Sequence, residues 1–293
     1  MAGQILELLV LAVMLGGIYA LVAVGITLIF GVLNIINAAH GEFFAVGGYV
    51  ALIASILLPS QAPLGIALGA VAGFALGAVA YRLLFEPLRN RASAGTAGPL
   101  FLVLTLGLSI FMQSSMLAIA GGDYYRVPPQ TSGGVDLNFI YLTNQRLMIV
   151  AVAVVSLVGL FLFLRYARQG AAIRAVAQNP EASQAVGIPL ARIFTLTVAL
   201  GCALAALGGA LLTPIINVFP TVGFPLTIKA FAITILGGLG NVLGALLASF
   251  LIAAIEVFSI FVIPSEWKDA IAFGSMILVL LVKPNGLLGR SSR

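Results

Sequence analysis

Charged side chains are scarce in this sequence of 293 residues. Asp, Glu, Lys and Arg make up 8% of it, whereas roughly a quarter is usual in a soluble globular domain. Hydrophobic residues make up 61%, which is more apolar surface than a soluble fold of this size can bury. The composition therefore excludes an ordinary soluble domain and indicates a membrane protein. The 33 glycines agree with helices that pack closely in a bilayer.

Cysteine and histidine are almost absent, with Cys202 and His40 the single residue of each type. One thiol excludes a disulfide within the chain, and a lone histidine offers no second ligand for a His/Cys metal site. The same scarcity argues against an intramembrane enzyme, which needs a nucleophile beside a base, or a metal cluster. The net charge of +5 is carried by residues too few and too scattered for a nucleic-acid-binding stripe.

Two short motifs are also missing. No Gly-x-x-x-x-Gly-Lys-[Ser/Thr] loop is present, so the chain carries no ATP-hydrolysing site of that type, and we expect it not to be an enzyme. The first apolar segment lacks a basic N-terminal flank and contains Glu7 instead. We therefore interpret it as a retained membrane span rather than a signal peptide.

What the sequence does contain is a series of apolar segments, most of them close to the ~20 residues that a spanning helix needs. The candidate spans are 5–33, 41–58, 63–81, 99–119, 147–164, 193–213, 227–258 and 268–283. The segment 227–258 is too long for one crossing and is interrupted by Gly237, Gly238 and Gly240. We predict an all-α polytopic membrane protein with about eight spans, one of them broken or re-entrant near 227–258.

Basic residues between the spans predict the orientation, because cytoplasmic loops carry an excess of Lys and Arg. Ten of the 14 fall in three regions: Arg82, Arg89 and Arg91; Arg165, Arg168, Arg174 and Arg192; and Lys283, Arg290 and Arg293. These regions share one side if the N-terminus is outside and the C-terminus is cytoplasmic. The segment 227–258 must then start and end outside, as a re-entrant hairpin or as two short crossings. Its break, from Gly237 to Asn241, should lie inside the protein or on a water-filled path, since lipid excludes exposed non-helical backbone.

A polar cluster of Asn34, Asn37, His40 and Glu42 joins the first two spans, and we expect it near their cytoplasmic ends. Polar residues at membrane depth are costly and usually face an aqueous path or the interior of a bundle. Together with the break at Gly237–Asn241, the cluster is a candidate translocation path or gate, or a contact with a cytoplasmic partner. The alternative is a structural bend in which Asn and His side chains cap helix ends.

Three further charges lie in or beside the later spans. Glu256 is a lone carboxylate near the outer end of 227–258, and we expect it to reach the interface or to form a hydrogen bond in the interior. Lys229 and Lys268 lie near the ends of spans, and we interpret them as interface anchors.

The loop 165–192 carries signals for two short helices, predicted at 170–178 and 180–186. The second has an N-cap, a first-turn proline, a first-turn acid and a glycine after its end, which are Asn179, Pro180, Glu181 and Gly187. A short capped helix with small exposed residues is suited to docking in a groove of a partner. An ordinary interfacial linker is the alternative.

The sequence of this second helix resembles a known pattern. Glu181, Ala182 and Ser183 followed by Gly187 are similar to the Glu-Ala-Ala…Gly pattern in permeases of ATP-binding-cassette importers. Ser183 replaces the usual second Ala, and the downstream Ile-x-Leu-Pro element is absent at its expected spacing. The wider sequence resembles the branched-chain amino acid permease family. The segments that carry this resemblance are 36–42 (Ile-Asn-Ala-Ala-His-Gly-Glu), 179–182 (Asn-Pro-Glu-Ala), 235–241 (Ile-Leu-Gly-Gly-Leu-Gly-Asn) and 283–289 (Lys-Pro-Asn-Gly-Leu-Leu-Gly). The resemblance therefore covers nearly the whole chain.

The resemblance implies a single transmembrane permease domain over 1–293, with 165–192 as the cytoplasmic loop that couples to an ATPase. Coupling would involve Asn179, Pro180, Glu181, Ala182, Ser183 and Gly187. The implied partners are a second homologous permease subunit, two cytoplasmic ATPase subunits and an extracytoplasmic substrate-binding protein. We expect the loaded binding protein to dock on the outer loops near 120–146 and 214–226.

In this resemblance the chain matches the smaller of two permeases of a bacterial plasma (inner) membrane. It would bind no cofactor itself, and ATP would be used by the partner subunits. The implied function is alternating-access import of branched-chain, hydrophobic amino acids. Urea and short amides are the alternative solutes, because a similar permease family serves them. A proton-coupled secondary transporter is a further alternative, in which His40 and Glu42 would relay protons.

Overall fold

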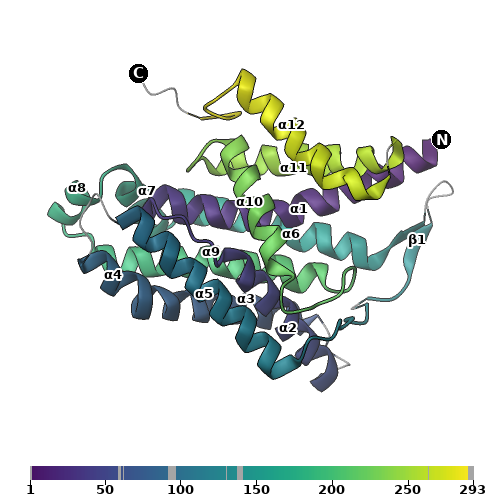
Figure 1. Cartoon of the computed structure of the whole chain (residues 1–293), viewed down its shortest axis with the longest axis horizontal. Helices are drawn as coiled ribbons and strands as arrows, with labels where there is room; N and C mark the ends of the chain where they lie inside the picture. Colours follow the sequence, from purple (N-terminus) through teal and green to yellow (C-terminus); the bar gives the residue numbers. More distant parts are fainter. Residues whose placement is uncertain are drawn as a thin grey trace.

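The computed structural model describes residues 2–58, 61, 63–91, 97–129, 131–136, 141–262 and 264–289. Arg290 and Arg293, which were counted in the basic tail, lie outside these ranges. Most of the described chain is helical, and Figure 1 shows α1, α6 and α9 running along the longest axis of the molecule.

The helices of the first half are α1 (Ala2–Leu33), α2 (His40–Leu57), α3 (Leu64–Ala80), the π-helical turn η2 (Tyr81–Phe85), α4 (Glu86–Arg91) and α5 (Ala97–Ala120). A hairpin of β1 (Gly134–Asp136) and β2 (Tyr141–Thr143) follows, paired antiparallel with Val135 opposite Leu142. The second half contains α6 (Asn144–Tyr166), α7 (Arg168–Gln178), α8 (Pro180–Ala185), α9 (Leu190–Leu212), α10 (Gly223–Gly237), α11 (Val242–Val262), η3 (Ser265–Trp267) and α12 (Lys268–Val282).

Within the described residues, seven helical stretches are long and apolar enough to cross a membrane. One of them, Leu64–Arg91, joins α3, η2 and α4. The predicted broken segment is two helices, α10 and α11, and both α10 and α12 have only 15 residues. The prediction of an all-α polytopic membrane protein with one broken segment is confirmed.

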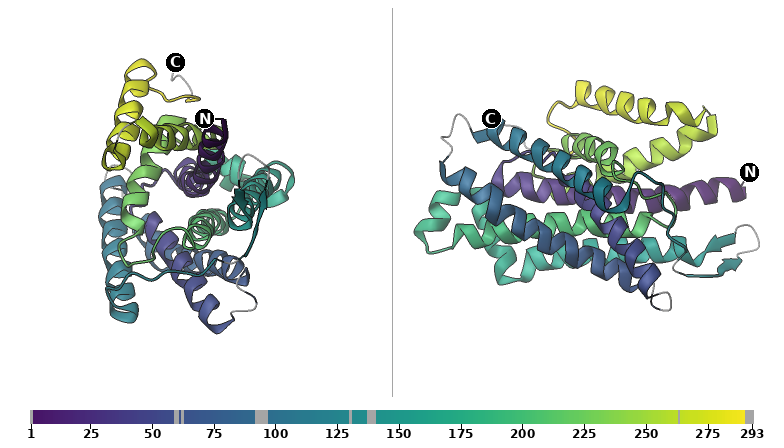
Figure 2. Two further views of the ribbon diagram at one scale, coloured as in Figure 1. Left: turned by 90° about the vertical axis from the view of Figure 1, so that its right-hand side faces the viewer. Right: turned by 60° about the horizontal axis from the view of Figure 1, so that its bottom comes forward.

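The interior of the bundle is formed by α1, α2 and α9. Their apolar stretches are 72%, 72% and 78% buried, whereas those of α5 and α6 are only 17% buried. The end-on view in Figure 2 shows α1 between the C-terminal helices (green to yellow) and α6 (teal). The outer helices therefore present apolar side chains to lipid, as expected when every backbone group is already paired within a helix.

Small residues bring α3 against α9. Glycines recur at every fourth residue of α3 and face small residues at every fourth position of α9. The pairs are Gly69 with Ala210, Gly73 with Ala206, and Gly77 with Cys202. Cβ atoms added to these glycines would crowd the facing side chains. The close packing of α3 against α9 therefore requires residues without a Cβ atom at these positions.

Two helices begin inside the bundle rather than at one of its ends. After α1 ends at Leu33, residues 34–39 are not helical, and α2 begins at His40, whose Nε2 lies 3.2 Å from the carbonyl oxygen of Val22. Val22 is eleven residues before Leu33, which is roughly 16 Å along the helix axis. Residues 213–222 return from the end of α9 without forming a helix, and α10 begins at Gly223.

The starts of α2 and α10 meet. The backbone amide of Gly41 donates to Thr227 Oγ1 at 2.9 Å. A Cβ at Gly41 or at Gly223 would overlap the backbone of the other glycine, so only glycine permits this approach. The helices α2 and α10 thus direct their N-termini toward the same region within the bundle.

The two ends of the bundle differ. We call the end that holds α4, α7 and α8 the basic end, and it lies at the left of Figure 1. The N-terminus and β1 lie at the opposite end. There Arg146 pairs with Glu7 at 3.2 Å, and a bridge between Tyr125 and Val218 joins the loop after α5 to the loop before α10.

Candidate functional site

The helix α8 is capped at both ends, as the sequence predicts. Asn179 Oδ1 accepts the backbone N–H of Ala182 at 2.9 Å, and Pro180 occupies the first helical position. At the other end Gly187 has a φ of +85°, and its N–H and that of Ile188 bond back to the carbonyls of Gln184 and Ser183. This is the Schellman arrangement, in which a left-handed glycine satisfies the last carbonyls of a helix.

The helix α8 stands out from the basic end of the bundle (Figure 1). Only Ser183 of the helix is buried, whereas Glu181, Ala182 and Gln184 are exposed. Val186, directly after α8, is 78% exposed. The surface of α8 that faces away from the protein is therefore small, mostly uncharged and available to a partner.

The predicted polar cluster of residues 34–42 divides into two parts. Asn34 has a φ of +55°, is exposed, and ends α1 with its N–H bonded to the carbonyl of Phe30. Asn37 is buried, and its Oδ1 accepts the N–H of Ala39 at 3.2 Å. These contacts shape the bend that leads the chain back into the bundle, and Asn37 Nδ2 has no partner in the described structure.

His40 and Glu42 lie deep in the bundle, and the expectation that they lie near the cytoplasmic ends of the spans is wrong. Both are completely buried. Glu42 Oε1 accepts from Ser109 Oγ at 2.9 Å and from Gln113 Nε2 at 2.7 Å. Glu42 Oε2 and His40 Nδ1 have no partner among the residues described. The cause of the difference is the bend at 34–39, which carries the start of α2 back to the level of Val22.

A cavity of about 270 Å³ lies beside this buried carboxylate, between α5, the loop after it and the loop before α10. Its lining includes Gln113, Leu117, Tyr124, Phe219 and Thr221. Gln113 connects the two, because it lines the cavity and donates to Glu42. The rings of Tyr124 and Phe219 pack with their centroids 4.9 Å apart. The cavity thus combines an apolar aromatic wall, an amide and a nearby helix N-terminus.

Sequence reasoning missed Ser109 and Gln113, although a signal was present. They are two polar residues spaced by four positions in the apolar span 99–119, which places them on one face of a helix. Their partner Glu42 is 67 and 71 positions away, respectively, so the contact could not be read from local spacing.

The turn between α10 and α11 is joined to the C-terminal segment. The N–H groups of Leu287 and Leu288 donate to the carbonyls of Leu236 and Gly237 at 2.7 and 3.2 Å. Asn241 Nδ2 donates to the carbonyl of Leu288 at 2.7 Å, and Asn241 Oδ1 accepts the N–H of Gly244 at 3.0 Å. The segment 283–289 therefore caps the end of α10, whose last carbonyls would otherwise lack partners.

The glycines predicted to lie inside the protein or on a water-filled path are only partly enclosed. Gly237 and Gly238 are buried, whereas Gly240 is exposed at the basic end. Gly240 and Asn241 line a cavity of about 740 Å³ there, together with Asn34 and residues of α7. The structure thus brings Asn34, Gly240 and Asn241 together and keeps His40 and Glu42 apart from them.

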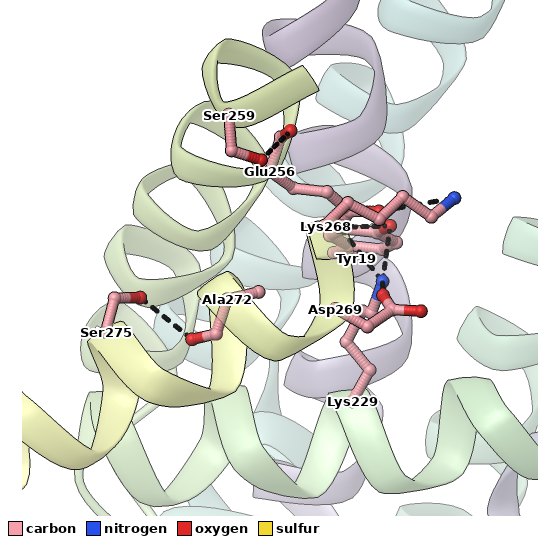
Figure 3. Close-up of polar contacts among 8 residues, drawn as sticks. All are labelled: Tyr19, Lys229, Glu256, Ser259, Lys268, Asp269, Ala272 and Ser275. Carbon is pink, nitrogen blue, oxygen red and sulfur yellow. Dashed lines mark hydrogen bonds and ion pairs between the residues drawn. The ribbon is translucent and has the colours of Figure 1, made fainter. Parts of the chain in front are cut away.

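A charge cluster that reaches from the interior of the bundle to its surface joins four helices (Figure 3), with Glu256 4% and Asp269 53% exposed. Lys229 Nζ of α10 lies 2.9 Å from Glu256 Oε2 of α11 and 2.8 Å from Asp269 Oδ1 of α12. Tyr19 of α1 donates to the same Glu256 oxygen at 2.9 Å. Lys268 is more distant, 4.0 Å from Glu256 Oε1.

The interpretation of Lys229 as an interface anchor is wrong, because its side chain is only 12% exposed and is held by two carboxylates. The expected interior hydrogen bond of Glu256 is confirmed. In the sequence Lys229 lies near the predicted start of a span, which suggests a position at the interface. Its side chain is largely buried instead, because α10 starts within the bundle.

These features define a class. The chain is a polytopic α-helical membrane protein with broken spans, an internal polar site where two helix starts meet, and a capped helix standing out at one end. Such an architecture is typical of transport proteins, in which discontinuous helices meet within the membrane.

Comparison with known proteins identifies the family. The family model described as "Branched-chain amino acid transport system / permease component" matches residues 8–280, and the chain belongs to this family. It is 34% identical to the high-affinity branched-chain amino acid transport system permease protein BraD of Pseudomonas aeruginosa, over 97% of this chain and 96% of that protein. It is 34% identical to the corresponding protein LivH of Escherichia coli (strain K12), over 95% of this chain and 93% of LivH. A more distant relative is the permease protein LivM of Salmonella typhimurium, 25% identical over 92% of this chain and 68% of LivM.

Proposed function

We propose that this chain is a membrane-spanning permease subunit of an ATP-binding-cassette importer for branched-chain amino acids. Its partners are a second homologous permease, two ATPase subunits and an extracytoplasmic binding protein. ATP is used by the partners, and this chain binds no cofactor. The N-terminus lies outside and the basic end faces the cytoplasm of a bacterial inner membrane, in agreement with the excess of Lys and Arg at that end.

The observation that carries this proposal is the helix α8, within a chain that belongs to the permease family. Its caps hold it in one conformation, and its exposed small residues leave room for a groove on an ATPase subunit. LivM is also a branched-chain amino acid permease protein, but it is less similar to this chain than BraD and LivH are. This more distant similarity supports a second, homologous permease as the partner.

We place the solute near the meeting point of α2 and α10. A branched-chain amino acid carries a carboxylate, an ammonium group and an apolar side chain. The N-terminus of α10 favours a carboxylate, and Glu42 favours a cation. Leu117, Tyr124 and Phe219 supply apolar surface in the adjoining cavity. Discontinuous helices recognise such solutes in other transporters by the same means.

The proposed function is tested by uptake into vesicles that contain this chain with its partner subunits and binding protein. Radiolabelled leucine and urea are compared, and Glu181→Lys is compared with Glu266→Lys, which reverses an exposed charge at the opposite end. We expect leucine uptake that requires ATP, is lost in Glu181→Lys and is kept in Glu266→Lys. Uptake of urea in place of leucine would overturn the proposed solute and keep the importer proposal. Uptake by this chain alone, driven by a proton gradient, would overturn the importer proposal and point to His40 and Glu42 as a proton relay.

The solute site has its own test. Glu42→Gln should raise the KM for leucine by about tenfold or more, because it removes the charge that faces the ammonium group. As a control, 4-methylpentanoate, which is leucine without its amino group, should compete with leucine equally well in the wild type and in Glu42→Gln. If the variant bound both leucine and 4-methylpentanoate more weakly, the substitution would have damaged the fold rather than the ammonium site.

A further inference from the structure

An apolar groove enters the bundle from the basic end. It has a volume of about 420 Å³ and lies between α1, α6, α7 and α11. Its walls include Leu28, Val32, Phe161, Leu164 and Leu243. A volume of this size lies within the roughly 300–1,000 Å³ of typical ligand sites. The lining residues lie in the last two turns of α1 and α6, in α7 and at the start of α11, so the groove occupies the basic end of the bundle.

Two arginines stand at the mouth of the groove. Arg165 in the last turn of α6 and Arg174 of α7 both line it and are both exposed. In the described part of the chain neither guanidinium has an acidic partner. The neighbouring cavity of about 740 Å³ shares Arg174 and adds Arg89, whose buried Nη1 has no hydrogen-bond partner among the described residues. Positive charge is therefore concentrated where the apolar walls end.

We propose that this groove binds an anionic phospholipid of the leaflet at the basic end. The acyl chain lies along the apolar walls, and the headgroup phosphate contacts Arg165 and Arg174. Guanidinium groups match phosphate oxygens in geometry and charge. Basic pockets between membrane helices recognise anionic headgroups by this combination.

The lining of the groove favours a lipid over the transported solute. Among the described residues, no Asp or Glu lines either cavity, so the ammonium group of an amino acid would meet only positive charge there. A free anion would leave the apolar walls exposed. A phospholipid matches both parts of the groove. Its charged headgroup would lie at the arginine-lined mouth, and its apolar acyl chain would lie against the apolar walls.

Binding is measured on the assembled transporter in detergent, by native mass spectrometry and by the shift of its thermal unfolding midpoint with added phosphatidylglycerol. Arg165→Gln/Arg174→Gln is compared with Arg168→Gln/Arg192→Gln, which removes two arginines of the same loop that do not line the groove. With about 1 kcal/mol per arginine near an anionic headgroup, we expect roughly thirty-fold weaker binding in the first pair and little change in the second. Phosphatidylcholine should not replace phosphatidylglycerol.

A second pair of variants tests the acyl-chain part of the groove. Leu243 and Leu247 lie one turn apart on α11 and are 51% and 54% exposed, but only Leu243 lines the groove. Leu243→Trp should displace the lipid, and Leu247→Trp should not. Equal lipid retention in all variants would overturn the proposal. So would an equal thermal shift with inorganic phosphate, which would make the arginines a site for free anions. Subunit dissociation in Arg165→Gln/Arg174→Gln, with unchanged lipid binding, would assign the arginines to a protein interface and also overturn it.

Discussion

Lys229 and Glu256 form a buried ion pair of 2.9 Å between α10 and α11. The side chain of Glu256 is only 4% exposed, and the same ammonium group also reaches Asp269 of α12. The helix α10 has only 15 residues, starts within the bundle and packs against α1, α2, α11 and α12. The ion pair therefore holds a short helix that also contacts the start of α2.

The first prediction concerns this pair. Lys229→Met should destabilise the protein by about 3–5 kcal/mol, because it leaves the Glu256 carboxylate buried without its cation. The double variant Lys229→Met/Glu256→Gln should recover part of that loss, since no uncompensated charge remains. The measurement is the thermal or denaturant unfolding of the purified protein in detergent, arranged as a double-mutant cycle.

Lys268→Met serves as the matched control. Its side chain is 42% exposed and 4.0 Å from Glu256, so its removal should cost no more than about 1 kcal/mol. If Lys229→Met were as mild as Lys268→Met, the pair would not hold α10 in place.

The second prediction concerns the contact between Gly41 and Gly223. Gly223→Ala should push the start of α10 away from α2, because the added Cβ overlaps the backbone of Gly41 and Glu42. We expect a loss of solute uptake of tenfold or more in the reconstituted transporter. Gly107→Ala on α5 is the control, since no described atom outside its own stretch of helix lies within 4 Å of its added Cβ. That substitution should leave uptake unchanged and stabilise its helix by up to about 1 kcal/mol. Wild-type uptake by Gly223→Ala would mean that the close approach of the two helix starts is not required.

The sequence predicted those parts of the fold that depend on local chemistry. Apolar length located the spans, and the caps of α8 followed from Asn179, Pro180 and Gly187. The break in 227–258 followed from its glycines, since a left-handed φ of +101° at Gly238 and +79° at Gly240 is easily adopted only by that residue type. In each case the residues that decide the structure lie within a few positions of one another.

The depth of a residue in the bundle could not be predicted in this way. His40 and Glu42 were expected near an end, because an irregular segment between two apolar runs usually lies outside the membrane. The segment 34–39 instead returns to the level of Val22, where Thr105 of α5 accepts the N–H of Ala38 at 3.1 Å. Lys229 was misplaced for the same reason. Such positions depend on contacts between residues that are far apart in the sequence.

The third prediction concerns Asn241, which makes two different contacts. Its Oδ1 caps α11 at Gly244, and its Nδ2 holds the carbonyl of Leu288. Asn241→Ala removes both and should cost about 2 kcal/mol, roughly one for the cap and one for the hydrogen bond. Asn241→Asp keeps the cap but loses the donor, so it should release the C-terminal segment while α11 stays intact.

Limited proteolysis after Lys283 measures release of this segment, and thermal unfolding measures the overall loss. We expect both variants to be cleaved faster than the wild type, with the larger drop in unfolding temperature for Asn241→Ala. Unchanged cleavage in Asn241→Asp would show that the N–H groups of Leu287 and Leu288 hold the segment without help from the side chain.

The fourth prediction separates two roles of Asn179. If it acts only as the N-cap of α8, Asn179→Asp should behave like the wild type, because a carboxylate accepts the N–H of Ala182 equally well and complements the helix dipole. Asn179→Ala should weaken the helix by about 1 kcal/mol and lower the amount of solute imported per ATP hydrolysed. The measurement is leucine uptake and phosphate release in the same vesicles. If Asn179→Asp lost coupling as severely as Asn179→Ala, the cap could not explain the loss. The amide of Asn179 would then have to contact the ATPase subunit directly, through the Nδ2 group that the cap leaves free.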